Sequence, residues 1–271
     1  MHTTSHSSLI DLQRLHGLLG ADQARFSIEA IAECESTNTL LLERSAQGAP
    51  SGSVIVCDRQ VAGRGSRGRQ WAASPEGSLT FSLLWDFPGG FEKVSGLSLG
   101  VGLAVVRALA ACGARGVALK WPNDILYRDA KLGGILVELT GDCDLARAVV
   151  GIGLNLSLPD IRSHGTPFMM TPTALDAIVS PLPDRHDLLA TLLKELADVF
   201  AVFSREGFAA LREQWLACHA WQGRAVKILR NGEVEKEGIC LGADEDGALL
   251  VHTGGGLERC ISGDVSLRAS T

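Results

Sequence analysis

The sequence lacks any closely spaced pair of cysteines. Its 271 residues include seven cysteines, an odd number, scattered along the chain without a C-x-x-C pair. This pattern argues against a secreted disulfide framework and against a zinc knuckle. A chain of this length also buries enough surface to be stable without disulfide bonds. We therefore expect reduced and mostly buried thiols.

Targeting signals and long apolar runs are missing as well. The first eight residues are polar, and no apolar segment follows a basic start, so we find no signal peptide. The longest apolar run, residues 97–106, ends at Arg107 and is far shorter than the roughly 20 residues that cross a bilayer. We expect a cytoplasmic protein without a membrane span.

Positive charge is scarce too. The chain has 25 Lys and Arg residues against 31 Asp and Glu residues, a net charge of −6, and so has no overall attraction to nucleic acid. Ahead of Phe26 there is room for one amphipathic helix, with apolar residues from Leu9 to Leu19, and too little chain for a helix-turn-helix module. We therefore predict no DNA binding, and any anion site has to be local.

The distribution of apolar residues predicts an α+β fold with two domains. Strands are expected at residues 53–58, 79–85, 117–121, 135–140 and 146–151, and helices at 97–112, 187–203 and 207–220. The last two helices are expected to cover a face of the sheet. After Trp221 the apolar period falls to two and turn signals recur. We assign residues 1–221 to a mixed sheet flanked by helices, with 1–25 as a helical extension, and residues 222–271 to a small all-β domain.

A segment rich in glycine and arginine follows the first predicted strand. Residues 63–68 match G-x-G-x-x-G, but no helix follows them, so a dinucleotide-binding site is not expected. Arg64, Arg67 and Arg69 lie among three glycines, and arginine forks match carboxylate and phosphate oxygens. The segment is either a local anion site or a solvated basic loop. The adjacent Trp71 is either a core residue or a face on which a base stacks.

Two further polar segments lie at predicted strand ends. Residues 120–124, Lys-Trp-Pro-Asn-Asp, suit nucleotide handling, although an ordinary Asx turn is the alternative. Lys131 stands at the start of a predicted buried strand. Asn155 stands at the end of another predicted strand, after Gly151 and Gly153, where it can form a hydrogen bond with a backbone group or a ligand hydroxyl. By contrast, the G-x-S-x-G match at residues 96–100 lies inside a helical run and predicts no catalytic serine.

Taken together, these segments resemble biotin protein ligase. The matching segments are residues 35–38, 60–65, 69–71, 120–124, 131–138 and 151–155, in the order and spacing of that family. The resemblance extends over about residues 30–271. It implies a class II synthetase-like catalytic domain followed by an SH3-like barrel, without the DNA-binding domain of the family's repressor members.

The resemblance implies a two-step reaction. The carboxylate of biotin attacks the α-phosphate of Mg-ATP to give biotinyl-5′-AMP and pyrophosphate, and a lysine of a biotin carboxyl carrier protein then takes the biotinyl group. No covalent enzyme intermediate forms. Biotin and ATP are thus the expected substrates, with Mg²⁺ accompanying ATP, and a monomer or weak homodimer is the expected state.

The resemblance also implies a role for individual residues. The expected biotin site comprises Ser36, Thr37, Asn38 and Gln60 at the ureido and thiophene end, Gly63, Arg64, Gly65 and Ser66 in the loop over its tail, and Lys131 and Gly134. The expected ATP and adenylate site comprises Arg69, Trp71, Lys120, Asn123, Lys131 and Asn155. The expected catalytic residues are Lys131, Arg64, Arg69 and Asp124. Asp124 would orient magnesium, help to deprotonate the incoming lysine, or only hold its turn.

One position departs from the family pattern. The loop of the family usually reads G-R-G-R-x-G-R, and its second arginine is Ser66 here. A serine cannot form the arginine fork, so either the adenylate is held less tightly or Arg67 substitutes. The rival functions are a lipoate ligase or octanoyltransferase, whose core is related, and a non-catalytic biotin sensor. The Lys-Trp-Pro-Asn-Asp segment and the C-terminal unit favour biotin, while Arg64, Arg69 and Lys131 argue against a mere sensor.

Overall fold

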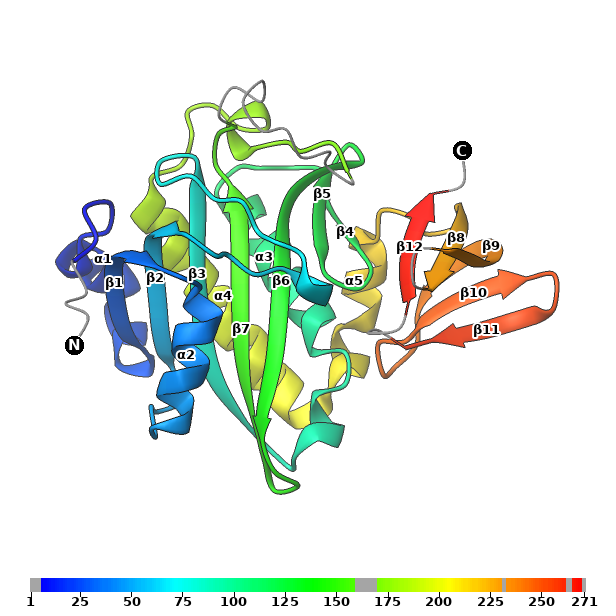
Figure 1. Cartoon of the computed structure of the whole chain (residues 1–271), viewed down its shortest axis with the longest axis horizontal. Coiled ribbons are helices and arrows are strands. Elements are labelled where there is room, and N and C mark those ends of the chain that lie inside the picture. The colour runs from blue at the N-terminus through cyan, green and yellow to red at the C-terminus, as the bar shows by residue number, and fades with distance from the viewer. Residues whose placement is uncertain (1–5, 159–169, 231–232, 262–264, 270–271) are drawn as a thin grey trace.

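A seven-stranded sheet forms the centre of the larger part of the molecule (Figure 1). The computed structural model describes residues 6–158, 170–230, 233–261 and 265–269, so residues 1–5 of the predicted extension lie outside it. The strands, in spatial order, are β1 (Ser27–Cys34), β2 (Ser53–Gln60), β3 (Ser78–Pro88), β7 (Leu145–Asn155), β6 (Ala130–Gly141), β5 (Asp124–Tyr127) and β4 (Val117–Lys120). Strands β1 and β2 run parallel, and the other neighbours are antiparallel. The predicted mixed sheet is confirmed.

Three elements were not predicted from the sequence, namely β1, β5 and the helix α2 (Thr37–Ala46). Strand β5 has only four residues, which is too short for a recognisable period. Helix α2 buries Thr37, Asn38 and Ser45 alongside Leu41, so it has no apolar stripe. Thr37 and Asn38 are buried there because they line the candidate site.

Helices pack on both faces of the sheet (Figure 1). Helices α3 (Leu97–Ala111) and α4 (Arg185–Glu206) cover one face, and α2 lies on the other. Helix α1 (Leu12–Leu19) packs against α4, and α5 (Arg212–Cys218) packs against α3. The helix predicted at 207–220 begins later, because Gly207 adopts a positive φ of 69° that ends α4 and a 3₁₀ turn precedes α5.

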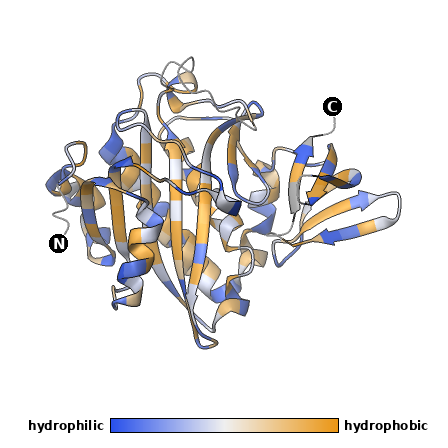
Figure 2. Cartoon of the chain, viewed as in Figure 1, coloured by the Kyte–Doolittle hydropathy of each residue, from blue (hydrophilic) through white to orange (hydrophobic). Residues whose placement is uncertain are grey.

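The main core lies between the sheet and helices α3 and α4. Hydrophobic residues follow the central strands in Figure 2, and Phe81 and Phe87 of β3 are fully buried there. The Phe87 ring meets the rings of Phe200 and Phe203 from α4 edge-on, with centroids 5.4 and 5.8 Å apart. Among the described residues, no helix is both long and apolar enough to span a bilayer.

A separate antiparallel sheet of five strands forms the C-terminal part of the chain, as predicted. Its strands are β11 (Gly256–Cys260), β10 (Leu249–Thr253), β9 (Glu233–Ala243), β8 (Ala225–Arg230) and β12 (Val265–Ala269), in spatial order. The Trp121 indole donates a hydrogen bond to the Gly247 carbonyl across the junction at 3.0 Å, and the Ser95 hydroxyl donates to the Asp246 carbonyl at 2.7 Å. These two hydrogen bonds attach the β9–β10 turn of the C-terminal sheet to the β4–β5 turn and to the segment before α3.

Candidate functional site

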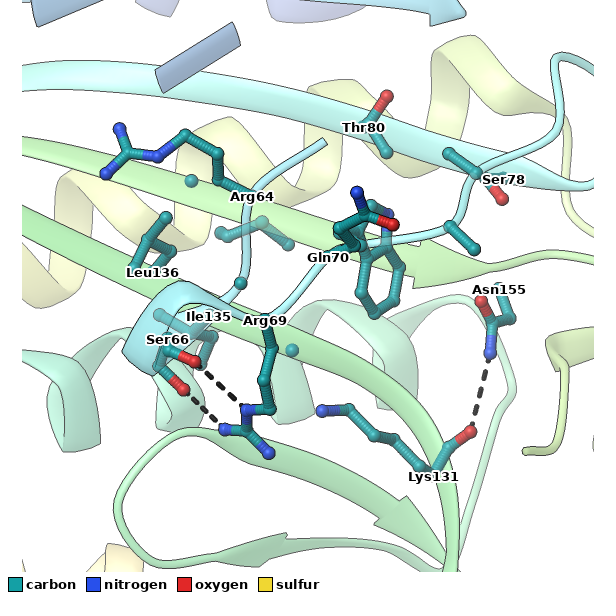
Figure 3. Close-up of a pocket in the computed structure, with 18 of the residues that line it drawn as sticks. Arg64, Ser66, Arg69, Gln70, Ser78, Thr80, Lys131, Ile135, Leu136 and Asn155 are labelled. Carbon is teal, nitrogen blue, oxygen red and sulfur yellow. Dashed lines mark hydrogen bonds between the residues drawn. The ribbon is translucent and has the colours of Figure 1, made fainter. Parts of the chain in front are cut away.

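A cavity of about 580 Å³ opens over the strand ends of the large sheet (Figure 3). Its walls come from the start of α2, the loop after β2, the β4–β5 turn and strands β3, β6 and β7. All the residues predicted for the site line this cavity except Gly63. Gly63 lies in the same loop, where its carbonyl accepts a hydrogen bond from the Trp71 backbone N–H at 2.8 Å. The structure therefore brings together residues that the sequence separates widely.

One end of the cavity has a floor of buried hydroxyl and amide groups. Gln60 Oε1 accepts a hydrogen bond from the Thr37 backbone N–H at 2.7 Å, which fixes the start of α2 to the end of β2. The Ser82 hydroxyl of β3 contacts Thr37 Oγ1 at 2.7 Å and Asn38 Oδ1 at 2.5 Å. Ser36, Thr37, Asn38 and Ser82 are all buried. A small polar ring placed here would meet groups whose directions are already set.

Ser82 was not predicted from the sequence, because it stands in the middle of an apolar strand with no motif around it.

The backbone of β7 also makes room for this network of hydrogen bonds. A Cβ atom on Gly151 would overlap the side-chain oxygen of Asn38, so only glycine allows Asn38 to lie flat on the strand. This explains one of the glycines that the sequence places in β7.

Two lysines share one carboxylate near the middle of the cavity. Lys120 Nζ lies 2.8 Å from Asp124 Oδ2, and Lys131 Nζ lies 2.5 Å from Asp124 Oδ1. Burial by itself would raise the pKa of Asp124, but the two ammonium groups outweigh it and lower that pKa to about 2. Burial also lowers the pKa of Lys120, against the opposing effect of Asp124. One carboxylate balances only one of the two ammonium groups, so a net positive charge remains in the cavity for an anionic ligand.

The loop after β2 folds back on itself in place of opening a helix. The Gly65 backbone N–H donates to the Arg69 carbonyl at 2.7 Å, and Arg69 in turn donates from Nε to the Ser66 carbonyl at 3.0 Å and from Nη2 to Ser66 Oγ at 2.6 Å (Figure 3). Arg67 at the tip adopts a positive φ of 61°. The chain continues from this loop into β3 without an α-helix, so the segment is a loop, as predicted.

Arg64 does not point towards Lys131. Figure 3 shows its guanidinium directed away from the Lys131 side chain. It forms a two-pronged ion pair with Glu138 of β6, with Nη2 2.7 Å from Oε1 and Nη1 3.1 Å from Oε2. The resemblance implied a place for Arg64 over the tail of biotin, and in this structure the side chain lies against β6.

Trp71 and two asparagines also line the cavity. The Trp71 indole lies against β7 at Gly153, where a Cβ atom would come within 2.6 Å of the ring atom Cζ2. The buried Trp71 Nε1 has no hydrogen-bond partner among the described residues. Asn123 and Asn155 donate to the carbonyls of Ile135 and Thr173, both at 2.9 Å. The asparagine amides therefore brace the backbone around the cavity.

Arg268 reaches the same cavity from the C-terminal sheet. Burial lowers the pKa of this arginine, the nearby charge of Arg69 lowers it further, and Asp124 opposes both. Sequence reasoning missed Arg268 because no local motif surrounds it and the contact is made only by the packing of the two sheets. A second cavity of about 510 Å³ adjoins the first and also has Lys120, Asp124 and Arg268 in its wall.

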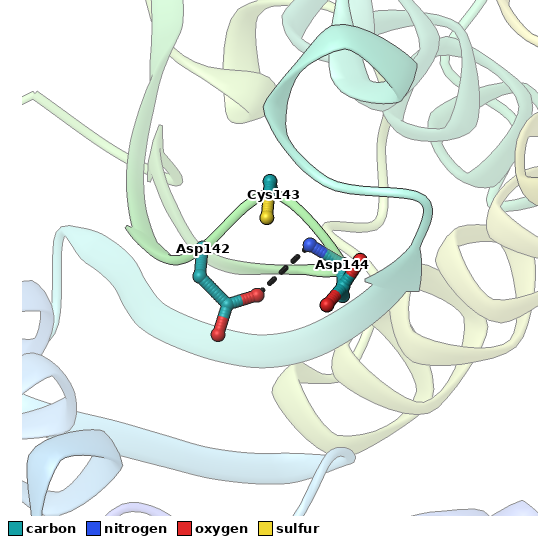
Figure 4. A group of neighbouring side chains, drawn as sticks. All are labelled: Asp142, Cys143 and Asp144. Carbon is teal, nitrogen blue, oxygen red and sulfur yellow. Dashed lines mark hydrogen bonds between the residues drawn. The ribbon is translucent and has the colours of Figure 1, made fainter.

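An acidic cluster lies at the tip of the β6–β7 hairpin, outside both cavities (Figure 4). It consists of Asp142, Cys143 and Asp144, all exposed. Asp142 Oδ1 accepts hydrogen bonds from the backbone N–H groups of Asp144 at 2.9 Å and Leu145 at 3.0 Å. These bonds close the hairpin turn and account for the cluster, so we assign no metal to it.

Comparison with known protein families gives two matches along the chain. Residues 31–155 match the biotin/lipoate A/B protein ligase family, and residues 223–268 match the biotin protein ligase C terminal domain. The first range includes almost all of the cavity residues, and the second corresponds to the C-terminal sheet.

Individual proteins are similar over most of the chain. The bifunctional ligase/repressor BirA of Escherichia coli strain K12 is 35% identical over 245 residues, which cover 90% of this chain and 75% of that protein. The biotin–[acetyl-CoA-carboxylase] ligase of Paracoccus denitrificans is 35% identical over 225 residues, covering 82% of this chain and 92% of that one. The structure of the biotin protein ligase from Aquifex aeolicus in complex with biotin and ATP superimposes with a TM-score of 0.77 at 32% identity, covering 91% of this chain and 99% of the other.

Proposed function

We propose, because this chain belongs to the biotin/lipoate A/B protein ligase family, that it is an ATP-dependent biotin protein ligase. It activates biotin to biotinyl-5′-AMP and then transfers the biotinyl group to a lysine of a biotin carboxyl carrier protein. The observation that carries this proposal is the one cavity in which a buried polar floor lies next to two lysines and three arginines. Such a cavity suits a small polar vitamin at one end and phosphates beside it.

Activation of biotin requires two anions to approach each other. The carboxylate of biotin is already an ionised nucleophile, so no general base is needed in this step. Lys131 is placed to hold that carboxylate and the α-phosphate together, because it lines the cavity beside the buried Asp124 and is the more exposed of the two. Arg69 and Lys120 add positive charge where the pyrophosphate leaves. Positioning and charge neutralisation therefore supply the catalysis.

Mg²⁺ enters this proposal as part of Mg-ATP. Asp124 is the only carboxylate among the described residues that line the first cavity, and both of its oxygens are engaged by lysines. The described residues that line this cavity thus offer magnesium at most this one carboxylate, and the phosphates of ATP and water would supply the other ligands. Bound in that way, Mg²⁺ neutralises phosphate charge.

Transfer to the carrier protein needs a neutral lysine amine and a stabilised leaving group. The amine attacks the acyl carbon of biotinyl-5′-AMP, an amide bond forms, AMP leaves with the electron pair of the broken bond, and the proton that the amine loses passes to solvent. Lys131 and Lys120 stabilise the negative charge on AMP. Asp124, whose pKa is about 2, is too weak a base to take the proton from an ammonium group, so its role is to position the two lysines.

The polar floor also favours biotin over the rival substrates. Lipoate and octanoate would place an apolar group against Thr37, Asn38 and Gln60, and a site built to hydrogen-bond its substrate rejects analogues that lack the partner groups. We therefore expect biotin, but neither lipoate nor octanoate, to support exchange of labelled pyrophosphate into ATP. Exchange with either rival acid at a rate similar to that with biotin contradicts the proposal. No exchange with any acid favours a biotin sensor.

The solution state belongs to the same proposal. We propose that the chain acts in the cytoplasm as a monomer or weak homodimer without binding DNA, which the net charge of −6 supports. Light scattering over a range of concentrations checks the assembly, and retardation of DNA at low salt checks nucleic-acid binding. A stable larger assembly or specific DNA retardation contradicts it.

A further inference from the structure

Glu138 ends the family segment 131–138, lies behind the polar floor without lining either cavity, and has no part in the proposed reaction. It lies on β6, and its side chain is 22% exposed. Both of its oxygens are engaged by Arg64 of the loop after β2, at 2.7 and 3.1 Å. A two-pronged pair of this kind fixes the orientation of both side chains as well as the distance between them.

The same carboxylate also reaches the polar floor of the cavity. Glu138 Oε2 accepts a hydrogen bond from Asn38 Nδ2 at 3.0 Å. The other end of the Asn38 amide, Oδ1, meets the buried Ser82 hydroxyl. Glu138 therefore joins the first turn of α2 to the loop, through one charged group held on a central strand.

We propose that Glu138 is a positioning residue that couples occupation of the polar floor to closure of the loop carrying Arg64, Ser66 and Arg69. The proposal rests on the proposed biotin ligase function, because it concerns the same site. A ligand that contacts Asn38 changes the hydrogen bond that Asn38 Nδ2 donates to Glu138. The resulting shift of the Glu138 carboxylate changes its ion pair with Arg64. In the absence of ligand, the ion pair holds the base of the loop against β6.

Loss of the Glu138 charge should loosen the loop without removing a group that touches the reacting atoms. In Glu138→Gln, the side chain keeps its size and an oxygen that can accept from Asn38, but it loses the ion pair with Arg64. We expect the KM for biotin and the escape rate of biotinyl-5′-AMP each to rise about tenfold, which corresponds to about 1.4 kcal/mol. The kcat of pyrophosphate exchange should change by less than about twofold, since the lysines remain in place.

A second readout does not depend on activity. Trypsin cleaves after arginine, and Arg64, Arg67 and Arg69 in the loop are all exposed. Cleavage is scored by mass spectrometry after Arg67 and Arg69 only, because the Arg64→Gln variant lacks the site at Arg64. Cleavage of the unliganded loop should be faster in Glu138→Gln than in the parent chain. Arg64→Gln tests the same contact from its exposed end, so it serves if Glu138→Gln folds poorly. The double variant should be cleaved no faster than either single variant, because all three lack the same ion pair.

Glu33→Gln is the matched control. Glu33 pairs with Arg59 at 2.6 Å on the neighbouring strands β1 and β2, outside both cavities. Its loss should leave biotin KM, adenylate escape and loop cleavage unchanged. If Glu138→Gln behaves like this control, or if the effects of Glu138→Gln and Arg64→Gln on cleavage add, the coupling does not exist. Failure of the parent chain to catalyse exchange with biotin would instead refute the ligase function, and the cleavage experiment would still report on the loop.

Discussion

A single carboxylate, Asp124, holds two lysines of the cavity in place, and the lysine nearer to the opening is the most informative one to change. Lys131 is 27% exposed, whereas Lys120 is 5% exposed. Lys131→Ala removes the cation that we place between the two reacting anions. Biotin-dependent pyrophosphate exchange should fall by about 10²–10³-fold, as expected for loss of one charge-stabilising group.

The control for this variant is Lys93→Ala, which removes an exposed lysine outside both cavities. It should leave exchange unchanged. A Lys131→Ala variant that is folded and exchanges pyrophosphate at the normal rate would show that the bridging cation lies elsewhere.

Ser66 gives a second test at the residue scale. In the structure its hydroxyl and carbonyl both accept hydrogen bonds from the Arg69 side chain. Ser66 thus orients Arg69, whereas the family usually has an additional arginine at the position of Ser66. Ser66→Arg adds a fork that can bind phosphate. Labelled biotinyl-5′-AMP should therefore leave the Ser66→Arg variant more slowly than the parent chain. Equal release rates would mean that the departure from the family loop has no effect on retention.

The burial of His219 predicts that the fold loses stability in acid. Burial lowers its pKa from 6.5 to about 4, and its ring stacks on Trp215 with a centroid distance of 4.6 Å. The unfolded chain binds a proton at this histidine below about pH 6.5, whereas the folded chain does not until about pH 4. The stability from this site is thus present above pH 6.5 and is lost as the pH falls towards 4, by about 2–3 kcal/mol.

Urea unfolding at about pH 7 and about pH 4.5 measures this effect. His219→Phe keeps the stacking partner and removes the titration, so its free energy of unfolding should fall less between the two pH values than that of the parent, by about 2 kcal/mol. His252→Phe, at an exposed position of β10, serves as the control. The same loss of stability in His219→Phe and in the parent would show that other groups cause the acid sensitivity.

At the scale of single elements, β7 shows how glycines in a strand create a site. The strand pairs with β3 and β6 along its whole length, and Gly151 and Gly153 leave space for Asn38 and Trp71 respectively. Glycine weakens a strand, so its presence here is explained by the side chains that lie against it. The floor and the wall of the cavity are thus both determined by positions that carry no side chain.

Gly153→Ala tests this account. The new methyl group should push the Trp71 indole away from β7 without breaking the strand pairing, since the backbone bonds to β3 and β6 do not involve a side chain. We expect the KM for ATP to rise about tenfold with little change in thermal stability. Gly254→Ala, where a Cβ atom meets nothing within 4 Å, should change neither. Unaltered ATP kinetics in Gly153→Ala would place the nucleotide away from Trp71.

Elements with a strong apolar pattern could be predicted from the sequence, and elements that serve the site could not. Strand β3 and helix α3 follow from their apolar runs, because burial against the core determines both. Helix α2 has no such run, since Thr37 and Asn38 face the cavity in place of apolar side chains. Lys131 lies in a recognisable motif and was predicted for the site, whereas Ser82 has only ordinary strand residues around it. Glu138 lies inside the matching segment 131–138, but its contacts with Asn38 and Arg64 become visible only in the fold.

At the scale of the whole molecule, the C-terminal sheet contributes to the walls of both cavities. It brings Arg268 into the wall of both cavities, and the Trp121 indole ties its Gly247 carbonyl to the β4–β5 turn that carries Lys120 and Asp124. Contacts of this kind join segments that are distant in sequence, so no local pattern predicts them. The cation-rich cavity is thus a product of both sheets and of the loop that folds over it.

The most direct test of the central claim is the covalent labelling of an acceptor. The purified chain is incubated with biotin, Mg-ATP and a biotin carboxyl carrier domain, and intact-protein mass spectrometry follows the carrier. The account predicts a mass increase of one biotinyl group on the carrier, dependent on ATP and lost when the acceptor lysine is changed to arginine. A carrier whose mass does not change, while an established ligase labels it under the same conditions, would contradict the account.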